Sequence, residues 1–141
     1  MKHLAAIIFF CMMSVSCTEK QIDQSIEGSW YYKYGNTYYT KAPKWLELQF
    51  SEQSNEVTLI PHLKDPGDSW VETTGTYTRT GDNIIFNLSF KTEAIIPTSK
   101  EFLEGNIMMG PDKPIAITVK YKTYYGDNIS AKQMTFSRNK N

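Results

Sequence analysis

The stretch from Ile26 to Tyr39, IEGSWYYKYGNTYY, places six aromatic residues among the ten positions from Trp30 to Tyr39. Trp and Tyr favour β-strands, because their large side chains pack well on a pleated surface. We therefore predict that the first strand of the fold runs from Trp30 to about Tyr39, with a bend or bulge at Gly35-Asn36. Side chains alternate between the two faces of a strand, so some of these rings should enter the core and others should face outward.

Short segments of alternating apolar and polar residues continue through the rest of the chain. They include residues 45–50, 56–60, 84–90, 115–121 and 129–138, with Gly-Asp-Asn turn signals at 81–83 and 126–128 and a short turn expected within 98–104. This pattern predicts about eight or nine strands and no helix. Antiparallel strands joined by short turns commonly close on themselves, because closure removes exposed edges. We therefore predict an all-β fold, an antiparallel up-and-down barrel of about eight strands, with an open β-sandwich as the alternative.

The net charge and the positions of the cysteines narrow the possible classes of protein. The formal net charge is zero, so the chain has no electrostatic signature of a nucleic-acid-binding protein. Both cysteines, Cys11 and Cys17, lie close to the N-terminus, which leaves none for a disulfide in the rest of the chain. We therefore expect the domain to be held together by its hydrophobic core, and we expect a monomer.

The first sixteen residues are typical of an export signal. Leu4 to Met13 is an unbroken apolar run about half as long as the ~20 residues of a transmembrane helix, and it fits the core of a signal peptide. Ser14-Val15-Ser16-Cys17 follows and resembles the lipobox of bacterial lipoprotein signals, although that family prefers Leu where Ser14 stands. The resemblance implies that Cys17 is lipidated. The alternatives are an ordinary signal peptide with a chance cysteine, and Cys11 as the lipidated residue.

These features divide the chain into three parts. Residues 1–16 are the expected lipoprotein signal peptide, residues 17–27 the lipidated cysteine and a polar tether, and residues 28–141 the barrel domain. Thr18, not Asp, follows Cys17. In the Gram-negative sorting rule implied by the lipoprotein resemblance, this favours the outer membrane. We therefore expect a lipid-anchored protein of the bacterial cell envelope.

Two positions at opposite ends of the domain resemble the lipocalin and wider calycin families. Gly28-Ser29-Trp30 is the G-x-W pattern at the start of the first strand, and Phe136-Ser137-Arg138 lies on the last expected strand. The resemblance implies that Trp30 packs across the closed end of the barrel beneath Arg138. The T-D-Y motif of lipocalins is missing, and the chain is short for that family. It is most similar to the small lipocalin-like lipoproteins of Gram-negative bacteria.

Alternation also predicts which side chains point into the barrel. Ile115 should share the buried face of its segment with Ile117, Val119 and Tyr121. The candidates for lining a ligand site are Tyr32, Tyr34, Phe86, Leu88, Val119, Tyr121 and Met134. These side chains could surround a small molecule, with tyrosine hydroxyls as hydrogen-bond donors, or they could fill the barrel completely.

Signals of catalysis are weak. His62, Asp65 and Asp68 could bind a cation, but Pro66-Gly67 explains the two acids as turn residues, and we expect neither a metal nor a cofactor. No nucleophile elbow or phosphate-binding loop is present, so we expect no enzymatic activity.

The expected function is therefore binding of a small hydrophobic or aromatic ligand in the barrel. Two alternatives remain. A filled barrel could act as an inhibitor or accessory subunit through loops at residues 61–69 and 98–113, with Met108, Met109 and Pro111 as an adaptable apolar patch. A carbohydrate-binding module could instead use exposed Trp45, Trp70 and tyrosines.

Overall fold

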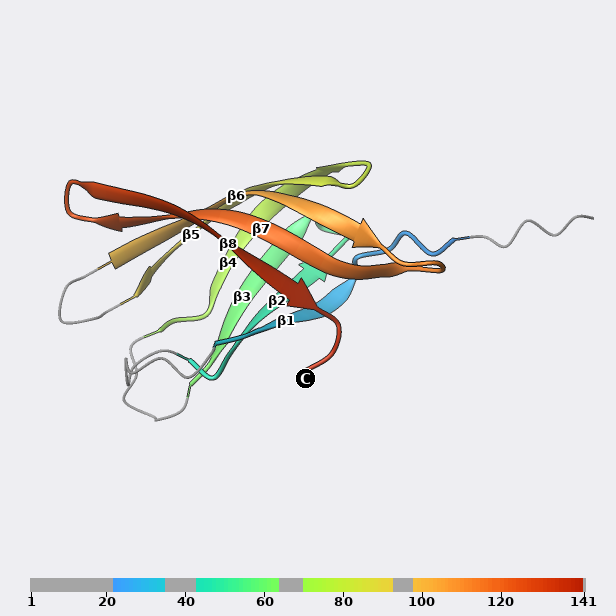
Figure 1. Cartoon of the computed structure of the whole chain (residues 1–141), viewed down its shortest axis with the longest axis horizontal. Coiled ribbons are helices and arrows are strands. Elements are labelled where there is room, and N and C mark those ends of the chain that lie inside the picture. Colours follow the sequence, from blue (N-terminus) through green and yellow to red (C-terminus); the bar gives the residue numbers. More distant parts are fainter. Residues whose placement is uncertain (1–21, 35–42, 64–69, 93–97, 141) are drawn as a thin grey trace, which may run out of the picture.

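The domain is a closed barrel of antiparallel strands. The computed structural model describes residues 22–34, 43–63, 70–92 and 98–140. Within them, eight strands follow one another around the barrel in chain order (Figure 1). They are β1 (Gly28–Lys33), β2 (Trp45–Ser51), β3 (Glu56–His62), β4 (Thr73–Thr80), β5 (Asn83–Thr92), β6 (Thr98–Met109), β7 (Pro114–Tyr125) and β8 (Asn128–Ser137). The predicted all-β up-and-down barrel is confirmed, and the open sandwich is excluded.

Two hairpin turns agree with the sequence patterns that predicted them. Thr80 pairs with Asn83, and Tyr125 pairs with Asn128, so each turn contains two residues. The glycine of each turn, Gly81 and Gly126, has a φ of +60° and +55° respectively. Glycine adopts this left-handed conformation without steric cost, and such turns match the twist of the strands that they join.

Strand alternation places one face of each strand in the core, as predicted. Leu46, Leu48 and Phe50 of β2 are buried, and the inward residues of β5 are buried in the same way. The largest fully buried side chains include Trp30, Phe50, Phe102 and Phe136. Burying an apolar side chain of this size contributes about 1.5–3 kcal/mol, so this interior face supplies most of the driving force for folding.

The prediction of a turn within Thr98–Glu104 was wrong. These residues form the first part of β6, which pairs with β5 on one side and β7 on the other. Phe102 is almost completely buried, and Thr98 at the start of the strand is buried as well. Three polar residues lie between them, and one of these, Lys100, occupies an inward position, which concealed the alternation of the strand in the sequence.

The prediction that Ile115 is buried was also wrong. Ile115 is exposed, whereas Ile117 and Val119 are buried. The pairing of β6 with β7 shifts at this point, because Met108 lies opposite Ala116 and Met109 lies opposite Pro114. This β-bulge adds one residue to β7 and reverses the alternation before Ala116, which turns Ile115 outward.

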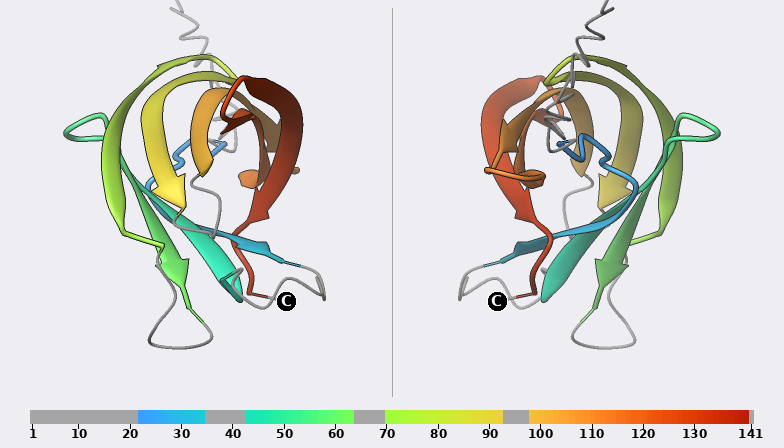
Figure 2. Two further views of the ribbon diagram at one scale, coloured as in Figure 1. Left: turned by 90° about the vertical axis from the view of Figure 1, so that its left-hand side faces the viewer. Right: turned by 90° about the vertical axis from the view of Figure 1, so that its right-hand side faces the viewer.

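One end of the barrel is covered by the segment before β1. Residues 23–27, which the sequence assigns to the tether, cross the end that carries the β2–β3, β4–β5 and β6–β7 turns (Figure 2). Hydrogen bonds join this segment to three parts of the barrel: Asp23 N donates to Asp112 O (3.0 Å), Arg79 Nη1 donates to Gln24 O (2.7 Å), and Ile26 N donates to Glu52 Oε1 (2.8 Å). Ile26 is fully buried. We call this the closed end.

The opposite end carries the β7–β8 turn and the connections between β1 and β2, β3 and β4, and β5 and β6. We call it the open end. Residues 35–42, 64–69 and 93–97 of these connections lie outside the described residues. The predicted bend at Gly35-Asn36 and the last two tyrosines of the opening stretch, Tyr38 and Tyr39, fall there. The same is true of the export signal and Cys17.

Candidate functional site

Trp30 and Arg138 meet at the closed end. Trp30 is fully buried, and its Nε1 donates a hydrogen bond to the carbonyl oxygen of Ile26 (2.9 Å). The Arg138 guanidinium lies over the Trp30 ring, with Cζ 4.1 Å from the ring centroid, and its Nη1 donates to Glu27 O (2.6 Å). Gly28 has a φ of +90°, and a Cβ there would lie 3.3 Å from Arg138 Nη1. The glycine of G-x-W therefore leaves room for the guanidinium, and the pair seals this end.

Six rings make a continuous set of contacts inside the barrel toward the open end. We call this set the aromatic circuit; in order around the barrel it consists of Tyr32, Tyr34, Trp70, Phe90, Phe102 and Phe136. Neighbouring centroids are between 5.2 and 6.3 Å apart, and the pairs are edge-to-face or tilted. Such pairs contribute about 0.5–1.5 kcal/mol each beyond their buried area. Tyr32, Tyr34 and Trp70 are only partly buried, so these rings form the accessible part of the circuit.

The predicted ligand-lining residues fall into two groups. Phe86, Leu88, Val119 and Met134 are buried within the core, where Phe86 contacts the rings of Phe50 and Phe102. The other three, Tyr32, Tyr34 and Tyr121, come together near the open end. Burial raises the pKa of the Tyr34 hydroxyl, and the neighbouring Tyr121 and Tyr32 raise it further. Tyr34 therefore stays protonated at neutral pH and can donate a hydrogen bond.

Lys100 also points into the barrel near the open end, and the sequence did not single it out. Lys100 lies two residues from Thr98 and two from Phe102 along β6, so it shares the inward face of the strand with these two buried residues. Its Nζ donates a hydrogen bond to Thr123 Oγ1 (2.8 Å) and lies 5.1 Å from the ring centroid of Tyr121. Burial lowers the pKa of the Lys100 amine to about 8, with a further contribution from Lys132. The alternation of Thr98, Lys100 and Phe102 could have revealed this residue, but the expected turn concealed it.

A second polar cluster lies on the outer face of β1, β2 and β3. Ser29 Oγ donates to Glu47 Oε1 (2.5 Å), and His62 Nε2 donates to Glu47 Oε2 (2.6 Å). Burial raises the pKa of Glu47, but these two hydrogen bonds and the nearby positive charge outweigh it and lower the pKa overall. Glu47 is therefore a stable anion between two donors. The serine bonds to the carboxylate and not to the histidine, so the cluster lacks the nucleophile-to-base contact of a catalytic triad.

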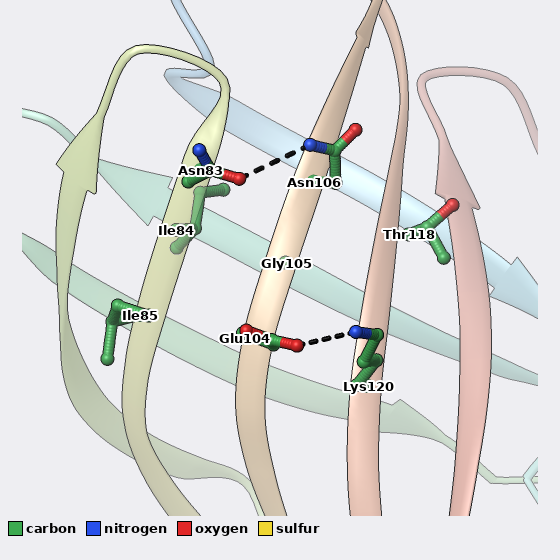
Figure 3. A pocket seen from close by; sticks show the side chains of 8 residues that line it. All are labelled: Asn83, Ile84, Ile85, Glu104, Gly105, Asn106, Thr118 and Lys120. Carbon is green, nitrogen blue, oxygen red and sulfur yellow. Dashed lines mark hydrogen bonds and ion pairs between the residues drawn. The ribbon is translucent and has the colours of Figure 1, made fainter.

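A hollow of about 490 Å³ lies on the outer surface of β5, β6 and β7 (Figure 3). Two side-chain pairs cross it, Asn106 to Asn83 (3.4 Å) and Lys120 to Glu104 (2.5 Å). Ile85 at its edge is 55% exposed. Nothing in the described part of the chain indicates which molecule would cover this hollow, and its side chains are neutral or already paired.

The remaining candidates from the sequence find less support. Trp70 belongs to the aromatic circuit, and Trp45 is half-buried with Lys33 Nζ 5.2 Å from its ring, so neither is the exposed platform expected of a sugar-binding module. Residues 98–109 are a strand and not a recognition loop. His62 bonds to Glu47, while Asp65 and Asp68 lie outside the described residues.

The described residues contain no group of three or more His, Cys, Asp and Glu side chains that could hold a metal ion. They also contain no helix of the length and apolarity needed to cross a bilayer. In comparisons with known proteins, no family model, no curated protein and no solved structure matches this chain.

Proposed function

We propose that this protein is a lipid-anchored, lipocalin-like protein of the bacterial cell envelope that binds a small hydrophobic or aromatic molecule at the open end of its barrel. The aromatic circuit carries this proposal. Its partly buried members Tyr32, Tyr34 and Trp70 lie toward the open end, whereas Trp30 and Arg138 seal the other end. Apolar and aromatic side chains with a few convergent polar groups are typical of small-molecule sites. The proposed role requires binding and no bond-breaking step.

Binding at the open end is tested with the neutral fluorophore N-phenyl-1-naphthylamine. We expect a dissociation constant of about 0.2 mM or lower, since about 17 heavy atoms that contribute about 0.3 kcal/mol each provide about 5 kcal/mol. Trp70→Ala should weaken binding about tenfold, because it removes a ring of the circuit that faces the ligand. Fluorescence titration of both proteins measures the two constants.

Trp45→Ala is the matched control for this experiment. Trp45 is also a half-buried tryptophan, but it lies on the outer face of β2 and contacts Lys33. Its loss should leave the affinity for the probe unchanged. Equal effects of the two substitutions, or no binding to the wild type, would refute a site at the open end. Non-denaturing mass spectrometry of the purified protein would in addition reveal any co-purified ligand as extra mass that is lost on denaturation.

Lipid anchoring is tested through Cys17. The full chain, expressed in a Gram-negative host with labelled palmitate, should incorporate the label and sediment with the outer-membrane fraction. Cys17→Ala should abolish both, because the thiol is the proposed attachment site, whereas Cys11→Ala should retain them. Two acyl chains or more are needed for stable anchoring, so partial release would indicate incomplete acylation. A wild-type protein without label would contradict the anchor but not the binding site.

A further inference from the structure

Lys100 occupies an unusual place for an amine. Lysine is almost never buried without a partner, because removing an ammonium from water is costly. The side chain extends from β6 toward the interior, where it meets Thr123, which is almost fully buried, and the Tyr121 ring. A hydroxyl and an aromatic face only partly replace the lost hydration of a positive charge. The fold therefore keeps a cation beside the aromatic circuit at an energetic cost.

No carboxylate compensates this charge within the described residues. The acid beside it in the chain, Glu101, extends from the other face of β6 and accepts a hydrogen bond from Tyr124 Oη (2.5 Å). No ion pair of Lys100 is found in the part of the chain that the structure describes. The outer lysine on the neighbouring strand, Lys120, is in contrast paired with Glu104. Lys100 therefore differs from Lys120, whose charge is balanced by an ion pair with a neighbouring strand.

A second lysine adds to the positive potential at this end. Lys132 of β8 pairs with Tyr121 of β7. It lies on the same face of β8 as the inward residues Met134 and Phe136. Its charge opposes protonation of Lys100. Lys100 lies opposite Phe90 of the aromatic circuit and over the Tyr121 ring, and Lys132 lies opposite Tyr121, so the two cations form an arrangement that an anion would stabilise.

We infer that the ligand is amphipathic, with an apolar or aromatic body against the aromatic circuit and an anionic head held by Lys100 and Lys132. This inference rests on the proposed function, since it assigns a chemical class to the ligand of the same site. A carboxylate head fits this arrangement, because its two oxygens can accept hydrogen bonds from the ammonium groups of Lys100 and Lys132. The head neutralises a charge that no carboxylate among the described residues compensates, and the body excludes water from that contact.

The test uses two fluorophores with the same ring system and different charge. N-phenyl-1-naphthylamine is neutral, and 1-anilinonaphthalene-8-sulfonate carries one negative charge. We expect the full-length wild-type protein to bind the anionic probe at least about tenfold more tightly than the neutral probe. A hydrogen bond between charged groups provides a difference in affinity of this size. Lys100→Met should remove this preference and leave the neutral probe unaffected. Lys120→Met, which alters a lysine on the outer surface, should retain the preference.

The possible outcomes separate the inference from the function on which it rests. Binding of both probes with a ratio that Lys100→Met does not change would overturn the anionic head and leave the binding site intact. Failure of both probes would overturn both. Circular dichroism would show whether Lys100→Met perturbs folding. In that case Lys132→Gln is the second test, because it removes the other positive charge of the site at an exposed side chain. It should reduce the preference for the anionic probe at least threefold. An unchanged ratio in that variant would also overturn the inference.

The pH dependence gives an independent readout. The titratable groups that the described residues place near Lys100 are the Lys132 amine and the Tyr121 phenol. The sulfonate stays ionised throughout, so the affinity for the anionic probe should fall as pH rises through about 8, where free Lys100 loses its proton. Affinity for the neutral probe should stay constant over this range. Displacement of the anionic probe by dodecanoate would indicate a ligand with an acyl body. Displacement by 2-naphthoate would indicate one with an aromatic body.

Discussion

Replacing Trp30 by alanine is expected to lower the free energy of unfolding by about 4 kcal/mol, near the upper end for a buried aromatic side chain. Three contributions add up at this position. The indole is fully buried, its Nε1 donates to the carbonyl oxygen of Ile26, and its face carries the Arg138 guanidinium. Removing the ring leaves a cavity, an unpaired carbonyl and a partly buried cation without its aromatic partner. Urea denaturation followed by circular dichroism measures the loss.

Trp45→Ala is the matched control for stability as well. Its ring is half-buried on the outer face of β2, and we expect a loss of about 1 kcal/mol, as for an ordinary surface contact. Comparable losses from the two substitutions would show that the closed end does not depend on Trp30. Trp30→Phe should lie between them, because it fills part of the cavity but cannot donate to Ile26.

Gly75→Ala is expected to destabilise the protein by about 3 kcal/mol, as overpacking in a rigid region does. A Cβ on Gly75 would lie 2.3 Å from the carbonyl oxygen of Asn87 and 3.1 Å from the Cα of Leu88. Both atoms belong to the backbone of β5, so no side chain can rotate to relieve the contact. Strand β4 would have to move away from β5, which disturbs their pairing from Thr76 onward. Thermal unfolding measures the change.

Gly81→Ala distinguishes steric contact from backbone strain. Nothing lies within 4 Å of a Cβ at this turn position, but its φ of +60° disfavours alanine. The expected cost is therefore only the conformational penalty of about 1–2 kcal/mol. A loss in Gly75→Ala no larger than that in Gly81→Ala would mean that β4 and β5 separate easily.

Local periodicity was sufficient to predict the strands whose inward residues are all apolar, because such a face depends only on alternation along one segment. Leu46, Leu48 and Phe50 are buried for this reason, and the Gly-Asp turns follow from backbone conformations open to glycine. Ile115 is a position where alternation along its own segment does not determine which way the side chain points. Its orientation depends on a bulge against β6, and the register between two strands is a tertiary property that one segment does not encode.

The polar features of the candidate site were harder to predict for the same reason. Glu47 and His62 meet diagonally across β2 and β3, so their contact depends on the register of that pair. Lys100 is a polar residue in an inward position, and a pattern that equates polar with outward assigns it to a turn. The approach of Arg138 to Trp30 requires the barrel to close, and only the resemblance to lipocalins suggested it.

The segment that covers the closed end also determines how the molecule would stand on a membrane. Ile22, the first described residue, precedes this segment, and an extended chain of five residues reaches at most about 18 Å, so an acylated Cys17 would keep the closed end close to the lipid. Strand β7 alone, with 12 residues, extends about 40 Å. In that orientation the aromatic circuit opens toward the aqueous phase. A ligand would then arrive from solution or from a soluble partner, and would not enter by lateral diffusion from the bilayer below.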